Sequence, residues 1–261
     1  MSPAEAVLLG ILQGLTEFLP VSSSGHLVIG EALLGIHEEG ILFEIAVHAA
    51  TLVAVVLFYR RRIGELLLGA LRREGSALAY GAKLALATLP AVAVALLLRD
   101  FVEAQFESPV TVGWALLATG ALLYTTRFTL PRASLPEPGY AAALAIGCAQ
   151  AVAILPGISR SGATVATALA LGVAPLAAAE FSFLLSIVAI AGAVVLALPD
   201  AMAASGERLA SLGVGGAAAL LSGVAALWLF LRLLRSRGFH HFAWYCWAAG
   251  GVLLVVLSLR G

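Results

Sequence analysis

Long apolar stretches alternate with short polar breaks along most of the 261-residue chain. A helix needs about 20 apolar residues to span a bilayer. Two further regions, 2–34 and 140–175, are equally apolar, but proline, glycine and serine break each of them in the middle. The expected half-helices cover 2–18 and 25–34 in the first region, and 140–158 and 162–175 in the second. Broken backbone is tolerated at membrane depth only where protein or a polar cavity covers it. The pattern therefore predicts an all-α polytopic membrane protein with two re-entrant helical hairpins and six transmembrane helices, near 41–59, 76–98, 109–126, 180–199, 212–234 and 241–259.

The order of these elements predicts an inverted-topology repeat. A hairpin and three spans fill residues 1–126, a proline-containing cytoplasmic linker fills 127–139, and a second hairpin and three spans fill 140–261. Because three spans is an odd number, the second repeat must be inserted upside down relative to the first. Inverted repeats of broken helices place the functional site near the bilayer midplane, where the tips meet. A constant offset of 137 residues aligns the tips, pairing Gly10 with Gly147, Gln13 with Gln150, Ser22 with Ser159, Ser24 with Ser161 and Gly25 with Gly162.

Composition and charge support a membrane protein. The chain is 61% hydrophobic and 11% charged with a mean hydropathy of +1.02, whereas soluble domains are about half apolar and about a quarter charged. The formal net charge of +0 gives no indication of a nucleic-acid partner. With the N-terminus outside, ten arginines fall inside and three outside, in agreement with the positive-inside rule. The ten are Arg60, Arg61, Arg62, Arg72, Arg73, Arg127, Arg132, Arg232, Arg235 and Arg237, and the three are Arg99, Arg208 and Arg260.

Ionisable residues are rare within the apolar segments, and the cost of burying each makes it a functional-site candidate. Arg160 is the strongest, because it lies between Ser159 and Ser161 just before an apolar half-helix. The free N–H groups of a helix N-terminus and a planar guanidinium together favour phosphate binding. The alternative is an arginine that pairs with Glu17 and only fixes the fold. The others are Glu17, His26, Glu44, His48, Lys83 and Glu180.

The first tip offers a phosphoryl acceptor. Ser23 occupies the place of Arg160 in the repeat alignment, so the two are expected to face each other across the site. A serine beside an arginine, a carboxylate and a histidine can act as a nucleophile. His26 follows Ser23 by three residues, within reach for proton exchange. The alternatives are that the serines at positions 22–24 only cap the half-helix and that His26 is merely a satisfied polar residue.

Gln13 and Glu17 are four residues apart and share one helix face. Glu17 could hold a divalent cation through its oxygens, with the carbonyl of Gln13 as a second ligand. It could instead act as a general base, or remain protonated in a hydrogen bond. The sequence leaves these alternatives open.

The two tips also carry a family resemblance. Q-G-L-T-E-F-L-P-V-S-S-S-G-H-L, from Gln13 to Leu27, and L-P-G-I-S-R-S-G-A-T, from Leu155 to Thr164, resemble the two signature motifs of the undecaprenyl-diphosphate phosphatase, or bacitracin-resistance, family. The resemblance covers the whole chain. It implies a multi-pass enzyme of the bacterial inner membrane that removes the terminal phosphate from undecaprenyl diphosphate, a prenyl diphosphate lipid, for peptidoglycan synthesis. It also implies an active site open to the periplasm and dependence on Mg²⁺ or Ca²⁺.

The resemblance assigns roles to individual residues. It implies a cation at Glu17 and Gln13, a nucleophile at Ser23, and further catalytic residues at His26 and Arg160. Many family members have Glu at the position of Gln13, so Glu17 is left here as the main acidic ligand. The expected substrate-binding residues are Gln13, Ser22, Ser24, Gly25, Ser159, Ser161, Gly162 and Thr164.

The expected reaction is attack of Ser23 on the terminal phosphorus, with Glu17 or His26 taking its proton; in a variant, a cation-bound water attacks directly. A second hypothesis is a transporter or flippase of a prenyl phosphate or another anion, since inverted repeats are also a transporter design. A carrier would need Arg160 but no nucleophile. The sequence leaves open whether the protein is a monomer or a homodimer.

Overall fold

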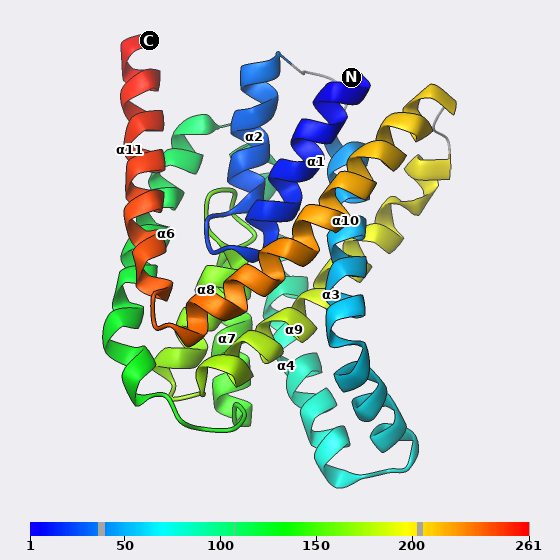
Figure 1. The fold of residues 1–261 in the computed structure, drawn as a ribbon, viewed down its shortest axis with the longest axis vertical. Coiled ribbons are helices and arrows are strands. Elements are labelled where there is room, and N and C mark those ends of the chain that lie inside the picture. Colours follow the sequence, from blue (N-terminus) through cyan, green and yellow to red (C-terminus); the bar gives the residue numbers. More distant parts are fainter. Residues whose placement is uncertain (36–39, 107, 203–205, 261) are drawn as a thin grey trace.

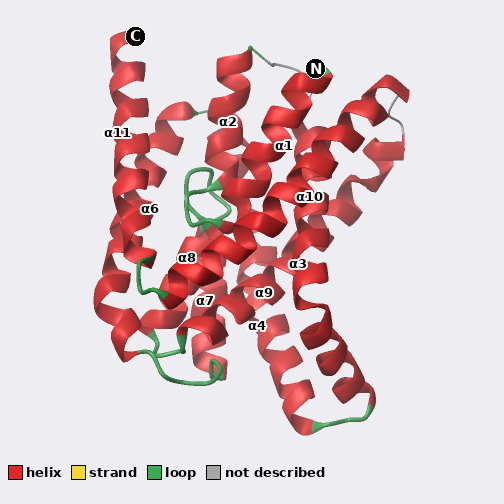
Figure 2. Ribbon diagram, viewed as in Figure 1, coloured by secondary structure: helices red, strands yellow, loops and turns green. Residues whose placement is uncertain are grey.

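The computed structural model describes residues 1–35, 40–106, 108–202 and 206–260, and the described backbone consists of helices joined by loops (Figure 2). Two short 3₁₀ helices, η1 (Leu130–Arg132) and η2 (Phe239–His241), precede α7 and α11. The α-helices in chain order are α1 (Pro3–Phe18), α2 (Ser23–Leu34), α3 (Gly40–Leu71), α4 (Gly75–Leu97), α5 (Arg99–Phe106), α6 (Pro109–Thr129), α7 (Tyr140–Val152), α8 (Arg160–Ala170), α9 (Pro175–Met202), α10 (Gly206–Arg235) and α11 (Phe242–Arg260).

Six helices of the described chain are long and apolar enough to cross a membrane, and they lie in α3, α4, α6, α9, α10 and α11. This confirms the prediction of an all-α, multi-pass membrane protein. The ends of the helices differ from the prediction. The third helix continues to Leu71 instead of ending near residue 59, because arginines favour a helix even where they leave the apolar layer. The ninth begins at Pro175 instead of near residue 180, and α5 was not predicted.

The two predicted breaks are present. The first helix begins with a capping box between Ser2 and Glu5 and ends at Phe18, because Leu19 is extended before Pro20. The second break is longer than expected: α7 ends at Val152 instead of near residue 158. The chain then turns at Gly157, which has φ +94°, before α8 begins at Arg160 instead of near residue 162. This helix ends at Ala170 instead of near residue 175, where Gly172 takes a positive φ.

The two pairs of broken helices enter the molecule from opposite ends (Figure 1). The first pair, α1 and α2, opens toward the end where both termini lie. The second pair, α7 and α8, opens toward the opposite end, and the two tips lie side by side between the ends. The passage of these pairs through a membrane and the division of the chain into two repeats stay predictions.

Packing between the two halves is reciprocal: α1 packs on α10, and α7 packs on α4. Both contacts are too close for a side chain. A Cβ on Gly10 would lie 2.2 Å from the Gly215 carbonyl oxygen, and a Cβ on Gly147 would lie 2.3 Å from that of Ala87. Small residues that let helix backbones approach closely are typical of membrane helix interfaces. Neither half therefore packs independently of the other.

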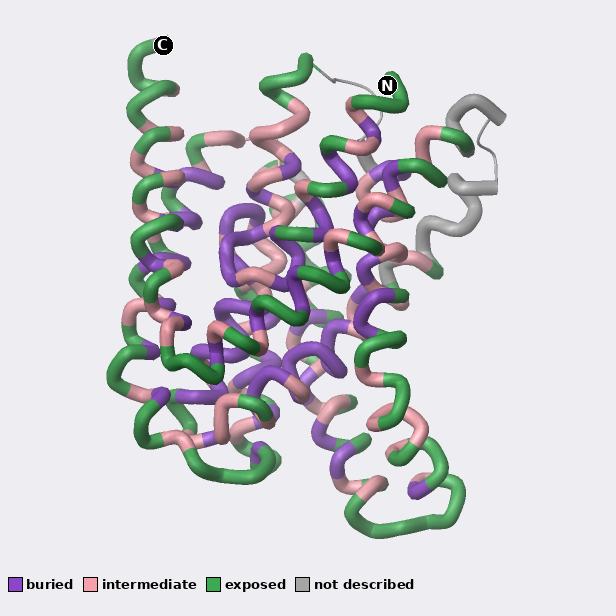
Figure 3. The backbone as a smooth tube through the Cα atoms, viewed as in Figure 1, coloured by how far each residue is buried: buried purple, intermediate pink, exposed green. Residues whose placement is uncertain are grey.

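An aromatic core supports the tips from one side. The ring of Phe18, at the end of α1, contacts the ring of Phe183 at a centroid distance of 5.7 Å. Phe183 contacts Phe230 at 5.0 Å, and Phe230 contacts Phe239 at 5.4 Å. All four rings are fully buried. Figure 3 shows buried residues gathered around the tips and α8, while the outer face of α11 and the turn between α3 and α4 are exposed. The core thus fixes the residue next to Glu17.

Three connections predicted to carry the inside arginines, α3–α4, α6–α7 and α10–α11, lie toward the end of the molecule opposite to both termini (Figure 1). The α6–α7 linker is tied to the body, because the backbone of Leu135 exchanges hydrogen bonds of 2.8 Å with Gly172 and Ala174. The side chains of Arg208 and Arg260, predicted at the other end, lie outside the described part of the chain. The backbone therefore groups the arginine-rich connections on one side.

Candidate functional site

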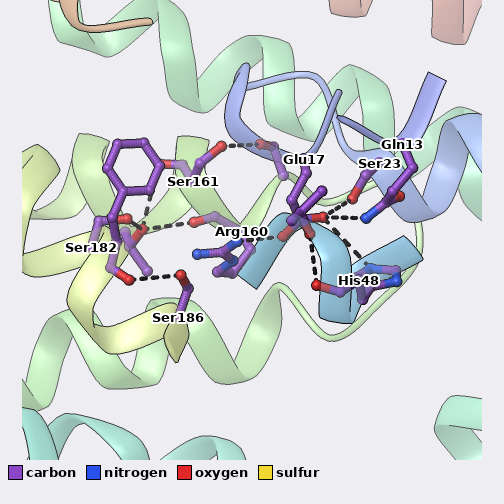
Figure 4. Close-up of polar contacts among 12 residues, drawn as sticks. Gln13, Glu17, Ser23, His48, Arg160, Ser161, Ser182 and Ser186 are labelled. Carbon is purple, nitrogen blue, oxygen red and sulfur yellow. Dashed lines mark hydrogen bonds and ion pairs between the residues drawn. The ribbon is translucent and has the colours of Figure 1, made fainter. Parts of the chain in front are cut away.

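The carboxylate of Glu17 is the centre of a polar cluster at the two tips (Figure 4). Its Oε1 accepts a hydrogen bond from Arg160 Nη2 at 2.5 Å. Its Oε2 accepts from Ser23 Oγ at 2.6 Å and from Gln13 Nε2 at 2.9 Å. The side chain of Glu17 is only 5% exposed, so the ion pair with Arg160 compensates a charge that would otherwise be very costly to bury. The structure thus brings together four predicted site residues.

Each tip has a cap serine, and one of the two also joins the tips to each other. Ser22 caps α2 and has φ 69°, and its Oγ accepts from the backbone N–H of Gly25 at 3.4 Å and of Gly157, in the opposite tip, at 3.0 Å. Ser159 caps α8, and its Oγ accepts from the N–H of Gly162 at 3.1 Å. Capping, the alternative weighed for the serines at positions 22–24, is thus observed for Ser22; Ser159 caps the second half-helix, where no cap was predicted. Their hydroxyls are therefore occupied by the backbone.

The remaining predicted residues extend the same hydroxyl network. Ser24 Oγ lies 3.3 Å from Ser22 Oγ, and Ser161 Oγ lies 3.3 Å from Ser159 Oγ, so aligned positions of the two tips make the same contact. Figure 4 shows Ser161 and the neighbouring Ser182 on the far side of Arg160 from Gln13. The hydroxyl of Thr164 donates to the Arg160 carbonyl at 2.7 Å and contacts Ser182 Oγ at 2.6 Å.

The imidazole of His26 makes its hydrogen bonds to residues other than Ser23. Its Nδ1 donates to the Ser22 carbonyl at 2.7 Å, which leaves Nε2 to accept from the hydroxyl of Tyr245, also at 2.7 Å. The two rings are stacked, with an interplanar angle of 12°. Both ring nitrogens therefore have partners outside the Glu17 cluster, and the proton exchange between His26 and Ser23 stays a prediction.

The histidine that faces Glu17 is His48, on α3. Its Nε2 lies 3.5 Å from Glu17 Oε2, and its Nδ1 donates to the Glu44 carbonyl at 2.6 Å. The sequence indicates His48 only as one of the ionisable candidates, because it lies in a long span outside both motifs. Its spacing of four from Glu44 and its rarity in an apolar span were the available signals.

Two buried polar atoms of the cluster have no hydrogen-bond partner among the described residues: Gln13 Oε1 and Arg160 Nη1. One is an acceptor and the other a donor, and they belong to residues on either side of Glu17 (Figure 4). A buried polar atom left unpaired costs about 1–3 kcal/mol. Gln13 thus offers one unused acceptor to a cationic group, and Arg160 offers one unused donor to an anionic group.

A divalent cation fits this donor set. Among the described residues, no group of three or more His, Cys, Asp or Glu side chains could hold a metal. A cation here would therefore depend on the Glu17 carboxylate and on the unpartnered oxygen of Gln13, whose Nε2 is the atom that contacts Glu17. Carboxylate and amide oxygens are hard ligands suited to Mg²⁺ and Ca²⁺, and Mg²⁺ is usually bound by one or two carboxylates together with phosphate oxygens of the substrate.

Two other ionisable candidates lie outside the cluster. Glu180 accepts from Arg62 Nε at 2.9 Å and from the hydroxyl of Tyr80 at 3.4 Å. Lys83 pairs with Glu137 of the α6–α7 linker at 2.8 Å. Both residues thus stabilise contacts between helices and the linker.

Comparison with known proteins points to one family. The family model described as bacitracin resistance protein BacA matches residues 6–252. A protein of Desulfatibacillum aliphaticivorans named undecaprenyl-diphosphatase is 41% identical over 268 residues, covering 96% of this chain and 97% of that protein. Proteins with the same name from Syntrophotalea carbinolica, 39% identical over 99% and 100% of the two chains, and Rhodopirellula baltica, 41% identical over 97% of each, are also similar.

Proposed function

This chain belongs to the family of the bacitracin resistance protein BacA, and from that premise we propose that it is an undecaprenyl-diphosphatase. The enzyme hydrolyses undecaprenyl diphosphate to undecaprenyl phosphate and inorganic phosphate, and thereby confers bacitracin resistance. One observation carries the assignment to the site: Ser23 Oγ lies 2.6 Å from the buried Glu17 carboxylate, which itself pairs with an arginine that keeps a free donor. Nucleophile, base and phosphate-binding group are thus in one cluster.

Arg160 binds the terminal phosphate in this proposal. Its Nη2 is held by Glu17, so the guanidinium is already oriented, and its unpartnered Nη1 donates to a phosphate oxygen. Arg160 is also the first residue of α8, where the helix N-terminus favours an anion. Phosphoryl transfer depends mainly on positioning and charge stabilisation, and both come here from a group held in place before the substrate binds.

Ser23 is the nucleophile. Its Oγ attacks the terminal phosphorus while its proton passes to Glu17 Oε2, the atom to which it already donates. The bond between that phosphorus and the bridging oxygen breaks, and undecaprenyl phosphate leaves with the electron pair. Water then hydrolyses the phosphoseryl group, and the proton that Glu17 holds returns to Ser23 Oγ as the serine is released.

The leaving group makes little demand on an acid catalyst. A phosphate monoester has a second pKa of about 6, so undecaprenyl phosphate can depart as an anion at neutral pH. This agrees with a site in which both nitrogens of His26 are bonded to Ser22 and Tyr245. We assign His26 a role in holding the first tip to α11.

Glu17 and Gln13 Oε1 would hold the Mg²⁺ or Ca²⁺ of the site. When bound, the cation would supply positive charge to offset that of the diphosphate and of the transition state. The residues of the chain perform the proton transfer and the phosphate binding described above.

We place the protein in the bacterial inner membrane with the site open to the periplasm. Support comes from the arginine-rich connections on one side of the molecule and from the positive-inside rule, which puts that side in the cytoplasm. The pair α1 and α2 then opens to the periplasm together with both termini.

The test is phosphate release from a prenyl diphosphate by purified protein in detergent, with and without EDTA, beside an Arg160→Ala variant. We expect release that EDTA prevents and that the variant lowers by at least about 100-fold, the usual effect of removing one transition-state donor. Because Arg160→Ala leaves Glu17 buried without its partner, circular dichroism must first establish that the variant is folded. No release by folded wild-type protein with any common divalent cation would refute the proposal and favour a lipid or anion carrier.

A further inference from the structure

His48 has no role in the reaction proposed above, yet its ring is fixed against the catalytic carboxylate. Nδ1 of His48 lies 2.6 Å from the carbonyl oxygen of Glu44. A carbonyl can only accept, so Nδ1 carries the proton and Nε2 of the neutral ring carries a lone pair. Metal-binding histidines are usually held in this way, with the distal N–H donated to a carbonyl or carboxylate that fixes the tautomer.

In the neutral ring, the lone pair of Nε2 would face another electron-rich atom. Glu17 Oε2 lies 3.5 Å away and already accepts hydrogen bonds from Ser23 and Gln13. A separation of 3.5 Å is long for a nitrogen–oxygen hydrogen bond. Two ligands at about 2.1 Å from one cation, however, lie roughly 3.0–3.4 Å apart at octahedral or tetrahedral angles. The observed spacing is thus close to that of two ligands sharing one ion.

We infer that His48 Nε2 is a nitrogen ligand of the divalent cation, which completes a set with Glu17 and Gln13 Oε1; His48 and Gln13 would keep the cation in place while Glu17 Oε2 carries the Ser23 proton. The inference rests on the proposed function for the presence of a cation. A proton on Nε2 would relieve the same repulsion, but it would leave Gln13 Oε1 buried and unpaired. A cation would engage that oxygen as well, once the amide of Gln13, whose Nε2 is the atom that contacts Glu17, turns its oxygen toward the carboxylate. Figure 4 shows Gln13, Ser23 and His48 approaching Glu17 from one side and Arg160 from the other, so the positive guanidinium is kept apart from the cation.

A nitrogen ligand changes which cation the site prefers. Ca²⁺ takes six to eight oxygen ligands, whereas imidazole suits first-row transition metals. Mn²⁺ accepts carboxylate and carbonyl oxygens, although it binds N/O sites more weakly than later metals of its row. Because a nitrogen ligand suits a transition metal better than Ca²⁺, we expect the protein to bind Mn²⁺ more tightly than Ca²⁺.

The experiment is pulsed electron paramagnetic resonance of Mn²⁺ bound to the full chain in detergent, which detects the nucleus of a directly coordinated nitrogen. We expect a ¹⁴N coupling in the wild type that His48→Gln abolishes and that His26→Gln, the matched histidine variant, retains. Titration with Mn²⁺ should show that His48→Gln weakens binding by at least about tenfold, because loss of even an outer partner of a metal site costs about 10- to 100-fold.

Bound Mn²⁺ without ¹⁴N coupling would overturn the inference, as would a coupling that survives in His48→Gln or failure of the wild type to bind Mn²⁺. Phosphate release measured on the same samples keeps the two proposals separate. Activity without the coupling would refute the role of His48 and leave the phosphatase intact. The coupling without phosphate release would support the ligand and refute the phosphatase.

Discussion

Ser22 and Ser23 are neighbours in sequence with different partners, which makes them a matched pair for testing the nucleophile. Ser23 Oγ donates to Glu17, whereas Ser22 Oγ accepts from two backbone N–H groups, one of them in the opposite tip. We predict that Ser23→Ala abolishes phosphate release and that Ser22→Ala retains it. Each variant removes one oxygen atom and leaves the neighbouring hydroxyl in place.

The expected losses of stability are similar, so a difference in activity cannot be attributed to unfolding. Ser23→Ala removes one hydrogen bond to a charged group, which is worth about 1.5–3 kcal/mol. Ser22→Ala leaves the N–H of Gly157 buried without a partner, at about 1–3 kcal/mol, and removes a helix cap worth about 1 kcal/mol. Both variants should lower the melting temperature by roughly 3–15 °C.

The expected losses of activity are very different. Removal of the serine nucleophile from a hydrolase costs on the order of 10⁶ in kcat, so Ser23→Ala should fall at least about 1,000-fold. Ser22→Ala keeps the nucleophile and should therefore stay within about tenfold of the wild-type rate per folded molecule. The remaining loss comes from a small shift of the tip, which lengthens the path of attack. Phosphate release is measured below both melting temperatures, with acid-quenched samples analysed for phosphoserine. Phosphate release by Ser23→Ala above a tenth of the wild-type rate would refute the assignment of Ser23 as the nucleophile.

Two further predictions concern the support of the tips. Gly157→Ala should lower the free energy of unfolding by about 2–5 kcal/mol, because residue 157 has φ +94° and a Cβ would lie 2.6 Å from the Val112 carbonyl oxygen. The control is Gly139→Ala, where a Cβ meets nothing within 4 Å. Equal melting temperatures of the two variants would contradict the reasoning. Tyr245→Phe should lower the free energy of unfolding by about 1 kcal/mol and leave kcat within about threefold of the wild type. A loss of kcat above about 100-fold would instead indicate a catalytic role for His26.

The spans could be predicted from the sequence because the thickness of the bilayer fixes the length of an apolar helix. The ends of the helices could not be predicted in this way. Hydropathy shows where the apolar layer ends, whereas a helix continues for as long as its residues favour helical backbone. The third helix illustrates this: it passes through the arginines at 60–62 without interruption. The breaks were predictable from Pro20 and Pro156, but the length of the second break follows from the conformation of Gly157, which hydropathy does not encode.

The grouping of Gln13, Ser23 and Arg160 around Glu17 could also be predicted. The repeat alignment places Ser23 opposite Arg160, and helical spacing places Gln13 beside Glu17. The histidine contacts could not be predicted. Spacing put His26 within reach of Ser23, but its ring turns back to the carbonyl of Ser22 in its own cap. The approach of His48 to Glu17 depends on how α3 packs against the first tip, and no local pattern carries that information.

The reciprocal packing of the halves has a consequence for biosynthesis. The partner of α1 is α10, and the end of α1 at Phe18 precedes the start of α10 at Gly206 by most of the chain. At a translation rate of roughly 5–20 residues per second, about 10–40 s separate the two. During that interval the first tip has neither its packing helix nor, for most of the time, the arginine that balances Glu17. The nascent chain must therefore hold Glu17 without its arginine until the second half is made, and the complete site can form only late in synthesis.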